Sequence, residues 1–262
     1  MFRKARFRAP SVAVQGGALA LVLVATVALA WRAGEPATAT GPTEAGQRNT
    51  SLAFLYAYEI DPGEDGAFFE GYKRHLDWHA QHSDSLSWLG WTVDAGNGLS
   101  VFVNGVFGVS GAAMDHRVEP DADGADAARN VAPYARAVFR HTYRVRRDLS
   151  RSARLEDNRP AAMQHVAWIT PAPGSGKALE GALRSLRDTR IELADYTVYE
   201  RLAGGRLPGL LLVVQYESWV ELSVKGANPV LVLQGLAGSS ISDIASEIWG
   251  FRSDLTYIPK GE

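Results

Sequence analysis

The chain has 262 residues, of which 46% are hydrophobic and 21% are charged, and this balance excludes a disordered polymer, a collagen-like fibre and a polytopic membrane protein. It contains no cysteine, which excludes disulfides, thiolate metal sites and cysteine nucleophiles. The formal net charge of −2, with no concentrated basic stretch in the folded part, argues against a nucleic-acid partner and favours a small molecule.

Residues 1–30 have the layout of a signal peptide. Four basic side chains lie within the first nine residues, an apolar run ends at Trp31, and Ala28-Leu29-Ala30 offers a cleavage site. Cleavage after Ala30 would remove four positive charges and no negative ones, changing the net charge from −2 to −6. The alternative is an uncleaved anchor, because Val12–Trp31 is long enough to cross a bilayer. Either way we expect an exported body, periplasmic or extracellular, whose membrane contact is limited to this segment.

Residues 31–50 are rich in Ala, Gly, Thr, Pro and Glu and show no apolar periodicity, so they are predicted to be a flexible linker. Residues 51–146 then follow the order β-α-β-β-α-β. The predicted elements are a strand over 52–60, a helix ending near 82, strands over 87–93 and 99–107, a helical segment near 127–135 and a strand over 138–145. We interpret the acidic run Asp121–Asp126 as a solvated loop, because it does not have the spacing of an EF-hand.

A charged linker is predicted over residues 147–162, and the same order of elements returns over residues 163–259. The predicted elements are strands over 164–170, 194–202 and 210–216, helices over 176–190 and 241–249, and a closing strand over 251–258. Pro62-Gly63 matches Pro173-Gly174 at an offset of 111 residues. A duplication of one ferredoxin-like unit is the simplest explanation.

The predicted hairpin of the first unit is apolar on both faces. Leu89, Trp91 and Val93 alternate with Trp88 and Gly90, whereas a two-layer fold needs only one apolar face. The second face must therefore be covered, most simply by the sheet of the other unit. The prediction is an α+β fold in which two tandem ferredoxin-like repeats pack their sheets face to face as an α/β barrel.

This arrangement resembles the dimeric α/β barrel superfamily in its tandem two-repeat form. The resemblance spans about Leu52 to Ile258 and rests on element order, the Pro-Gly turns and the doubly apolar sheets, with no diagnostic catalytic motif. It implies a range of activities that includes cofactor-free monooxygenases, haem-dependent enzymes, isomerases and lyases. The cofactor expected from it is haem or none, and fold analogy does not choose among these activities.

The first predicted helix carries three histidines. His75 and His79 are one helical turn apart near the sheet-facing side, and His82 follows them. They are candidates for a ligand pocket, for acid–base catalysis by His79 or His75, or for core histidines bonded to the backbone. There is no HExxH glutamate and no carboxylate on the same face, so we expect no metal, with these three histidines as the remaining candidates.

The hairpin beside this helix supplies further candidates. Trp88, Trp91 and Phe107 are aromatic residues at strand spacing, and Asn104 is the polar residue of an apolar strand. An amide is costly to bury without a partner, so Asn104 together with His79 and these aromatics forms the predicted ligand-binding set. The alternative is that the aromatic residues belong to the core.

The functional hypothesis is an exported protein that binds a small, mostly apolar ligand in the first repeat. The first alternative is an enzyme of the α/β-barrel monooxygenase or haem-dependent type that uses His79 or His75. The second is a structural or assembly module, such as a homo-oligomer with Trp78 at its interface.

Overall fold

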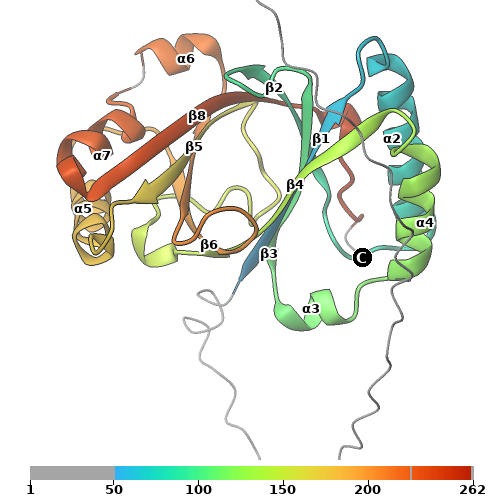
Figure 1. Cartoon of the computed structure of the whole chain (residues 1–262), viewed down its shortest axis with the longest axis horizontal. Helices are drawn as coiled ribbons and strands as arrows, with labels where there is room; N and C mark the ends of the chain where they lie inside the picture. The colour runs from blue at the N-terminus through green and yellow to red at the C-terminus, as the bar shows by residue number, and fades with distance from the viewer. Residues whose placement is uncertain (1–50, 225, 261–262) are drawn as a thin grey trace, which may run out of the picture. The chain divides into compact units, whose positions relative to one another are not determined.

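The computed structural model describes residues 51–224 and 226–260, all of which belong to one compact unit (Figure 1). The export segment and the linker predicted over residues 1–50 lie outside the described residues. The first half contains β1 (Leu52–Ile60), α2 (Asp65–Gln81), β2 (Leu89–Ala95), β3 (Val101–Val109), α3 (Gly111–Asp115), α4 (Pro120–Asn130) and β4 (Ala135–Val145).

The second half repeats this order element for element. It contains β5 (Met163–Pro171), α5 (Gly176–Asp188), β6 (Tyr196–Ala203), β7 (Leu210–Tyr216), α6 (Trp219–Val224), α7 (Pro229–Ala237) and β8 (Ile241–Phe251). Three short 3₁₀ turns lie at η1 (Arg147–Leu149), η2 (Gly238–Ser240) and η3 (Ser253–Leu255).

The eight strands close into one antiparallel barrel in the order β1-β3-β2-β8-β5-β7-β6-β4. The two halves meet at two seams, where β2 pairs with β8 and β4 pairs with β6. The helices of each half lie outside the barrel, α2 and α4 at one end and α5 and α7 at the other (Figure 1). The tandem two-repeat α/β barrel expected from the sequence is confirmed.

Both faces of each sheet are covered, as the doubly apolar strands require. Leu55, Trp91, Phe107, Val213 and Trp249 point into the barrel. Alternate residues of the same strands point outward and pack beneath the helices. Side chains of successive strand residues point to opposite faces, so one strand serves both layers.

Helix α2 forms because its apolar residues recur at helical spacing. Phe68, Tyr72 and Leu76 are buried along one stripe, and Gly63 turns the chain before the helix with a positive φ of 86°. The helix ends just before Ser83, whose φ is also positive. The stripe faces β1 and β3 and carries His75 and His79 inward with it.

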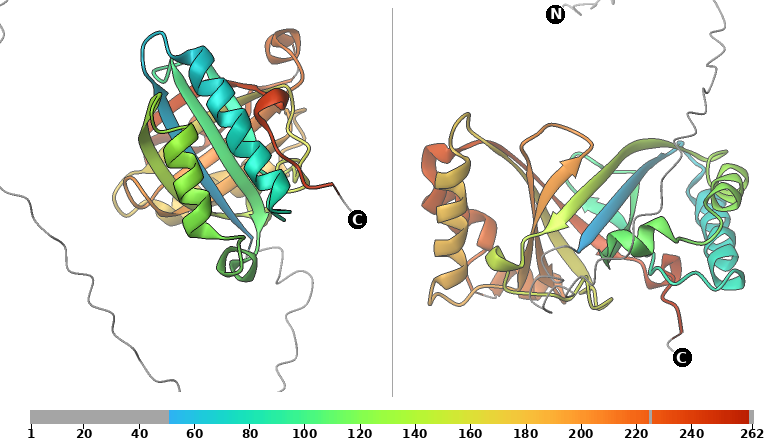
Figure 2. Two further views of the ribbon diagram at one scale, coloured as in Figure 1. Left: turned by 90° about the vertical axis from the view of Figure 1, so that its right-hand side faces the viewer. Right: turned by 90° about the horizontal axis from the view of Figure 1, so that it is seen from below.

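The acidic run interpreted as a solvated loop is helical instead. Asp121–Asp126 lies in the first turns of α4, and the predicted helix near 127–135 is only the end of this element. Pro120 at the first position and acidic residues in the first turn are typical of a helix start. The aspartates and Gly124 of this segment are also common in loops, which is why the sequence favoured a loop here. Helix α4 lies side by side with α2 over the sheet (Figure 2).

The prediction for the end of the second repeat was also wrong. Ile241–Phe251 is strand β8, and the helix of this region is α7, which Asn228 caps by accepting a hydrogen bond from the Val230 amide. Thr170 pairs with Asp243 and Pro171 with Ile241, so a bulge inserts one residue. The bulge brings Ile241 and Ile244 to the same face, and this spacing imitates a helix.

Among the described residues, no helix is both long enough and apolar enough to cross a membrane.

Candidate functional site

Helix α2 places two histidines against α4. His75 and His79 are four residues apart, so they lie on one face, with their ring centroids 4.7 Å apart. Both residues are buried, His79 almost completely. The residues of α4 that face them are Asp123 and Asp126, one helical turn apart.

Asp126 orients His75. Its Oδ2 accepts a hydrogen bond from His75 Nδ1 at 2.9 Å, and its Oδ1 accepts one from Asn130 Nδ2 at 3.0 Å. Because Nδ1 carries the donated proton, the lone pair of a neutral His75 ring lies on Nε2.

Asp84 orients His79 in the same way. Its Oδ2 accepts hydrogen bonds from His79 Nδ1 at 2.8 Å and from Trp88 Nε1 at 2.9 Å, and its Oδ1 accepts one from the Leu86 amide at 2.9 Å. The Trp88 ring also stacks on His79, with centroids 4.9 Å apart. These contacts fix the His79 ring, and in the neutral ring the lone pair again lies on Nε2.

The pKa shifts agree with these proton positions. Burial by itself raises the pKa of Asp84, but the hydrogen bonds from His79, Trp88 and Leu86 outweigh it and hold this pKa below its usual range. Burial lowers the pKa of His75, and the hydrogen bond to Asp126 only partly opposes it. At neutral pH, Asp84 is therefore ionised and His75 is neutral.

Asp123 faces both free imidazole nitrogens. Its Oδ1 lies 3.5 Å from His75 Nε2 and 3.6 Å from His79 Nε2, and one atom from each of the three side chains falls within 4.8 Å of the others. These residues are the ones that could hold a metal ion in the described part of the chain.

A cavity of about 160 Å³ opens beside this cluster, between α2, α4 and the outer face of the sheet. It is lined by Tyr56, Tyr58, Tyr72, His75, Trp88, Asn104, Arg117, Pro120, Asp123, Gly124, Ala127 and Arg140. The Tyr72 hydroxyl and Asn104 Oδ1 are buried here and have no hydrogen-bond partner of normal geometry among the described residues, although the Asn104 side chain lies near the hydroxyl. Burial raises the pKa of Tyr72 well above its ordinary value, so the Tyr72 hydroxyl stays neutral and can donate a hydrogen bond.

Two exposed arginines flank the same cavity. Arg140 lies over the ring of Tyr56, with its guanidinium carbon 5.6 Å from the ring centroid, and Arg117 comes from the segment before α4. They supply positive charge near the polar cavity.

A larger groove of about 640 Å³ runs between the end of α2 and the C-terminal segment. Its lining includes Asp84, but that carboxylate is already bonded to His79, Trp88 and Leu86. The smaller cavity brings together more ionisable groups and is the better candidate site.

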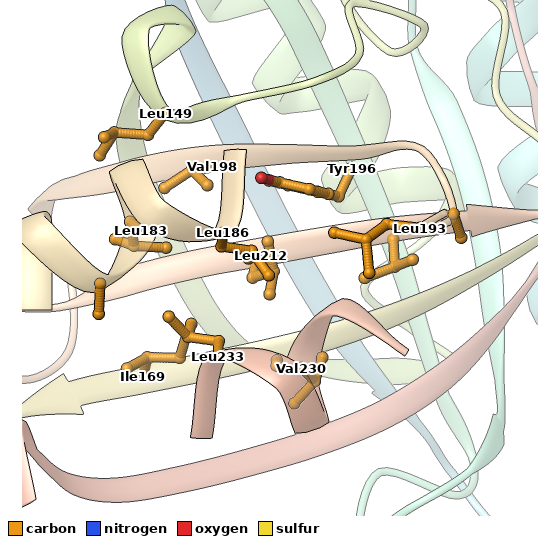
Figure 3. Packing of buried hydrophobic residues seen from close by; sticks show 14 of the residues in the cluster. Leu149, Ile169, Leu183, Leu186, Leu193, Tyr196, Val198, Leu212, Val230 and Leu233 are labelled. Carbon is orange, nitrogen blue, oxygen red and sulfur yellow. The ribbon is translucent and has the colours of Figure 1, made fainter. Parts of the chain in front are cut away.

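The second repeat has no such cluster under its helices in the described residues. Leu183 and Leu186 of α5 pack against Leu212 of the sheet and Leu233 of α7, and this space is filled by aliphatic side chains (Figure 3). Leu186 is the counterpart of His75, and α5 ends before the counterpart of His79, Arg190. The candidate site is therefore confined to the first repeat.

No protein-family profile and no curated protein sequence matches this chain. Solved structures do match. An anthrone oxidase-like protein has a TM-score of 0.55 and 14% identity, covering 82% of this chain and 96% of its own. A protein from Lactobacillus acidophilus, provisionally assigned as a monooxygenase, has a TM-score of 0.54 and 8% identity, covering 80% and 97%. A mutant chlorite dismutase from Candidatus Nitrospira defluvii has a TM-score of 0.53 and 7% identity, covering 79% and 93%.

The fold is that of the dimeric α/β barrels. At these identities the similarity shows the fold alone, and the activities of these proteins do not transfer with it.

The haem expected as one cofactor does not fit the first-repeat cavity. About 160 Å³ is below the roughly 300–1,000 Å³ of pockets that enclose drug-sized ligands. The Nε2 atoms of His75 and His79 also face the Asp123 carboxylate, and not an open space in which a haem ring could lie beside them.

The structure brings together only part of the predicted ligand-binding set. His79, Trp88 and Asn104 lie on the helix side of the sheet, near the cluster. Trp91 and Phe107 point into the barrel on the opposite face, with ring centroids 5.9 Å apart, and belong to its core.

His82 and Trp78 do not join the site. The Nδ1 of His82 is bonded to the backbone oxygen of Trp78, and the two rings stack with centroids 4.1 Å apart. Trp78 is half-buried and does not line the cavity.

Asp84, Asp123 and Asp126 are not among the site residues expected from the sequence. The helix-start signal at Pro120 would have placed Asp123 and Asp126 on one helical face. Asp84 lies just beyond the end of α2, and no local pattern marks its contact with His79.

Proposed function

We propose that the first repeat is an enzyme site for a small hydroxylated carboxylic acid. The observation that carries this proposal is the combination, in one cavity, of flanking arginines with buried polar atoms that lack partners. A carboxylate suits Arg117 and Arg140, because a guanidinium donates to carboxylates with good geometry. A hydroxyl suits Asn104 Oδ1, which needs a donor.

The cavity also argues for a ligand more polar than the sequence suggested. Three tyrosines, a histidine, an aspartate and an asparagine supply half of its lining, and two arginines add to it. Its volume admits only the reacting end of a substrate, so the charged end stays near the arginines. The His75–Asp123 cluster lies beside that reacting end and provides the ionisable groups that catalysis needs.

The structural neighbours support an enzyme at the level of the fold. The anthrone oxidase-like protein and the chlorite dismutase share the barrel, and the names of both refer to enzymes. Their chemistry is not carried over to this chain.

The test is calorimetry of the purified protein against small hydroxylated carboxylic acids and their neutral amides. We expect an acid to bind and its amide to bind weakly. Replacing Arg117 and Arg140 together by Met should weaken binding at least about tenfold, the equivalent of roughly 1.4 kcal/mol. Arg136→Met is the matched control, because Arg136 lies on the same strand but pairs with Glu59 outside the cavity.

Consumption of the bound acid, followed by mass spectrometry, tests the enzymatic part. We expect Asp123→Asn to abolish it. The proposal fails if no acid binds, or if binding is the same in the double arginine variant.

We also propose that residues 1–30 direct export. N-terminal sequencing of protein from fractionated cells should find a mature chain beginning near Trp31 outside the cytoplasm. An intact N-terminus in the cytoplasmic fraction would contradict this.

A further inference from the structure

The contact between α2 and α4 brings together three atoms that are all hydrogen-bond acceptors. His75 and His79 each use Nδ1 to donate to a carboxylate, so in the neutral rings the lone pairs lie on the Nε2 atoms, and both of these atoms face Asp123 Oδ1. The distances of 3.5 and 3.6 Å are too long for hydrogen bonds. Lone pairs turned toward one another in a buried place repel unless a positive charge lies between them.

We propose that His75 Nε2, His79 Nε2 and Asp123 Oδ1 bind a divalent transition-metal ion. This inference deepens the proposed function, because the ion would lie beside the same cavity, and it rests on that function for its catalytic meaning.

The spacing of the ligand atoms suits such an ion. Metal–ligand bonds of about 2.0–2.1 Å in tetrahedral geometry put neighbouring ligand atoms about 3.4 Å apart. Asp123 Oδ1 lies 3.5 Å from His75 Nε2 and 3.6 Å from His79 Nε2. Two neutral imidazoles and one carboxylate favour zinc, iron(II), cobalt(II) or nickel(II), whereas calcium and magnesium prefer oxygen ligands alone.

The surroundings resemble the outer shell of a metal site. Histidines that bind metals usually donate their other ring N–H to a carboxylate or carbonyl, which fixes the ring and makes it a better ligand. Asp126 does this for His75 and Asp84 does it for His79. The bonds from Trp88 and Leu86 hold Asp84 in turn. A histidine that only fills the core needs a hydrogen-bond partner for one ring nitrogen. It has no reason to direct its second ring nitrogen at a carboxylate that another histidine also faces, as His75 and His79 both do at Asp123.

The cavity supplies the second line of evidence. Three protein ligands leave a coordination position free, as in catalytic metal sites. His75 and Asp123 line the cavity directly, where Tyr72 and Asn104 place their unpartnered polar atoms. A substrate oxygen that reaches the ion would come within the same polar enclosure.

The competing explanation is a proton in place of the metal. A protonated His75 or His79 would form an ion pair with Asp123 and would need no metal. The two explanations predict opposite results when metal is added.

Cobalt(II) is the probe. The untagged full chain, dialysed against EDTA, is titrated with Co²⁺ while its visible d–d absorption is recorded, and metal content is measured after gel filtration. We expect stoichiometric binding and an absorption intensity typical of four- or five-coordinate cobalt. Asp123→Asn should weaken Co²⁺ binding at least about 100-fold, and Asp126→Asn about 10- to 100-fold, as for outer-shell partners.

Asp121→Asn is the matched control, because Asp121 is an exposed carboxylate in the same turn of α4. It should bind Co²⁺ like the unaltered chain. Circular dichroism establishes that each variant is folded. The inference is overturned if the unaltered chain shows no d–d absorption, or if Asp123→Asn binds Co²⁺ with unchanged affinity.

The outcomes separate the two proposals. Absence of metal binding, with acid binding still dependent on Arg117 and Arg140, overturns only the metal site. Metal binding without binding of any acid overturns only the proposed substrate class.

Discussion

Three aspartates determine what the two helix histidines can do. Asp84 and Asp126 take the Nδ1 protons, and Asp123 faces the Nε2 lone pairs. His79 is almost completely buried, so His79→Ala would leave a cavity and would also remove one hydrogen-bond donor from the buried Asp84 carboxylate. Asp123 is more exposed and does not support the fold in this way, which makes it the sharper probe of function.

The two tryptophans of the hairpin should behave differently. Trp91→Ala removes a ring from the barrel core and should destabilise the protein by about 3–5 kcal/mol, while the folded fraction binds Co²⁺ normally. Trp88→Phe keeps a ring over His79 but deletes the donor to Asp84, so it should weaken Co²⁺ binding about tenfold. Urea denaturation and the cobalt titration measure the two effects. Equal loss of cobalt affinity in both variants would contradict this assignment.

His141 on β4 should make the protein sensitive to acid. Burial, and then the nearby Arg201, lower its pKa to about 4. Its pKa in the unfolded chain is about 6.5, so the folded state binds fewer protons between these values. The stability associated with neutral His141 is therefore present above about pH 6.5 and is lost as pH falls toward 4.

His141→Asn should reduce this loss. Between about pH 6.5 and pH 4 the melting temperature of the variant should fall less steeply than that of the unaltered protein. His116→Asn, at an exposed histidine after α3, is the control and should keep the original slope. Parallel slopes for all three proteins would refute the role of His141.

At the scale of elements, the site depends on how closely α2 and α4 approach. A Cβ at Gly71 would overlap the backbone carbonyl oxygen of Asn130, so only glycine allows this separation. The approach lets Asp123 and Asp126 reach the histidines of α2, and the hydrogen bond from Arg74 to Asn130 lies beside it.

Gly71→Ala should therefore damage both the fold and the site. Forcing the helices apart should cost about 1–3 kcal/mol and weaken Co²⁺ binding. Gly66 lies in the same helix with open space around it, so Gly66→Ala should be neutral or stabilising by about 0.5–1 kcal/mol. Denaturant midpoints compare the two variants. A Gly71→Ala protein as stable as Gly66→Ala would show that the helices can move without cost.

At the scale of the whole molecule, neither half can be complete alone. Each sheet has one apolar face beneath its helices and another inside the barrel, which is covered only when β2 meets β8 and β4 meets β6. The segment after β4 also packs on the second half, where Leu149 is buried and Arg151 bonds to the last turn of α5.

A fragment of residues 51–146 should consequently dimerise or aggregate. The exposed barrel face, with Trp91 and Phe107, is too large an apolar surface for a soluble monomer. Co-expression with residues 147–262 should yield a soluble one-to-one complex. Light scattering after size-exclusion chromatography measures both, and a monomeric folded fragment 51–146 would contradict the expectation.

The sequence by itself determined the fold class, because the signals for it are local. Alternation along Leu89–Val93 shows two apolar faces, and the Pro-Gly turns repeat at a constant offset. It failed for Ile241–Phe251, where a bulge changes which residues share a face and makes a strand resemble a helix. The sequence also identified His75, His79 and Asn104, because polar residues within an apolar periodic pattern are visible without a structure. Trp88 was identified as an aromatic residue at strand spacing.

Only the tertiary structure decided which partners those residues have. His75 and Asp126 are 51 positions apart in the chain, and no periodicity records the packing of α2 on α4 that brings them to 2.9 Å. Trp88 and Trp91 are only three positions apart in the chain but lie on opposite faces of the sheet, so Trp91 belongs to the barrel core and Trp88 to the site. Local pattern determines the type of an element and its buried face, whereas the grouping of His75, His79 and Asp123 depends on contacts between elements distant along the chain.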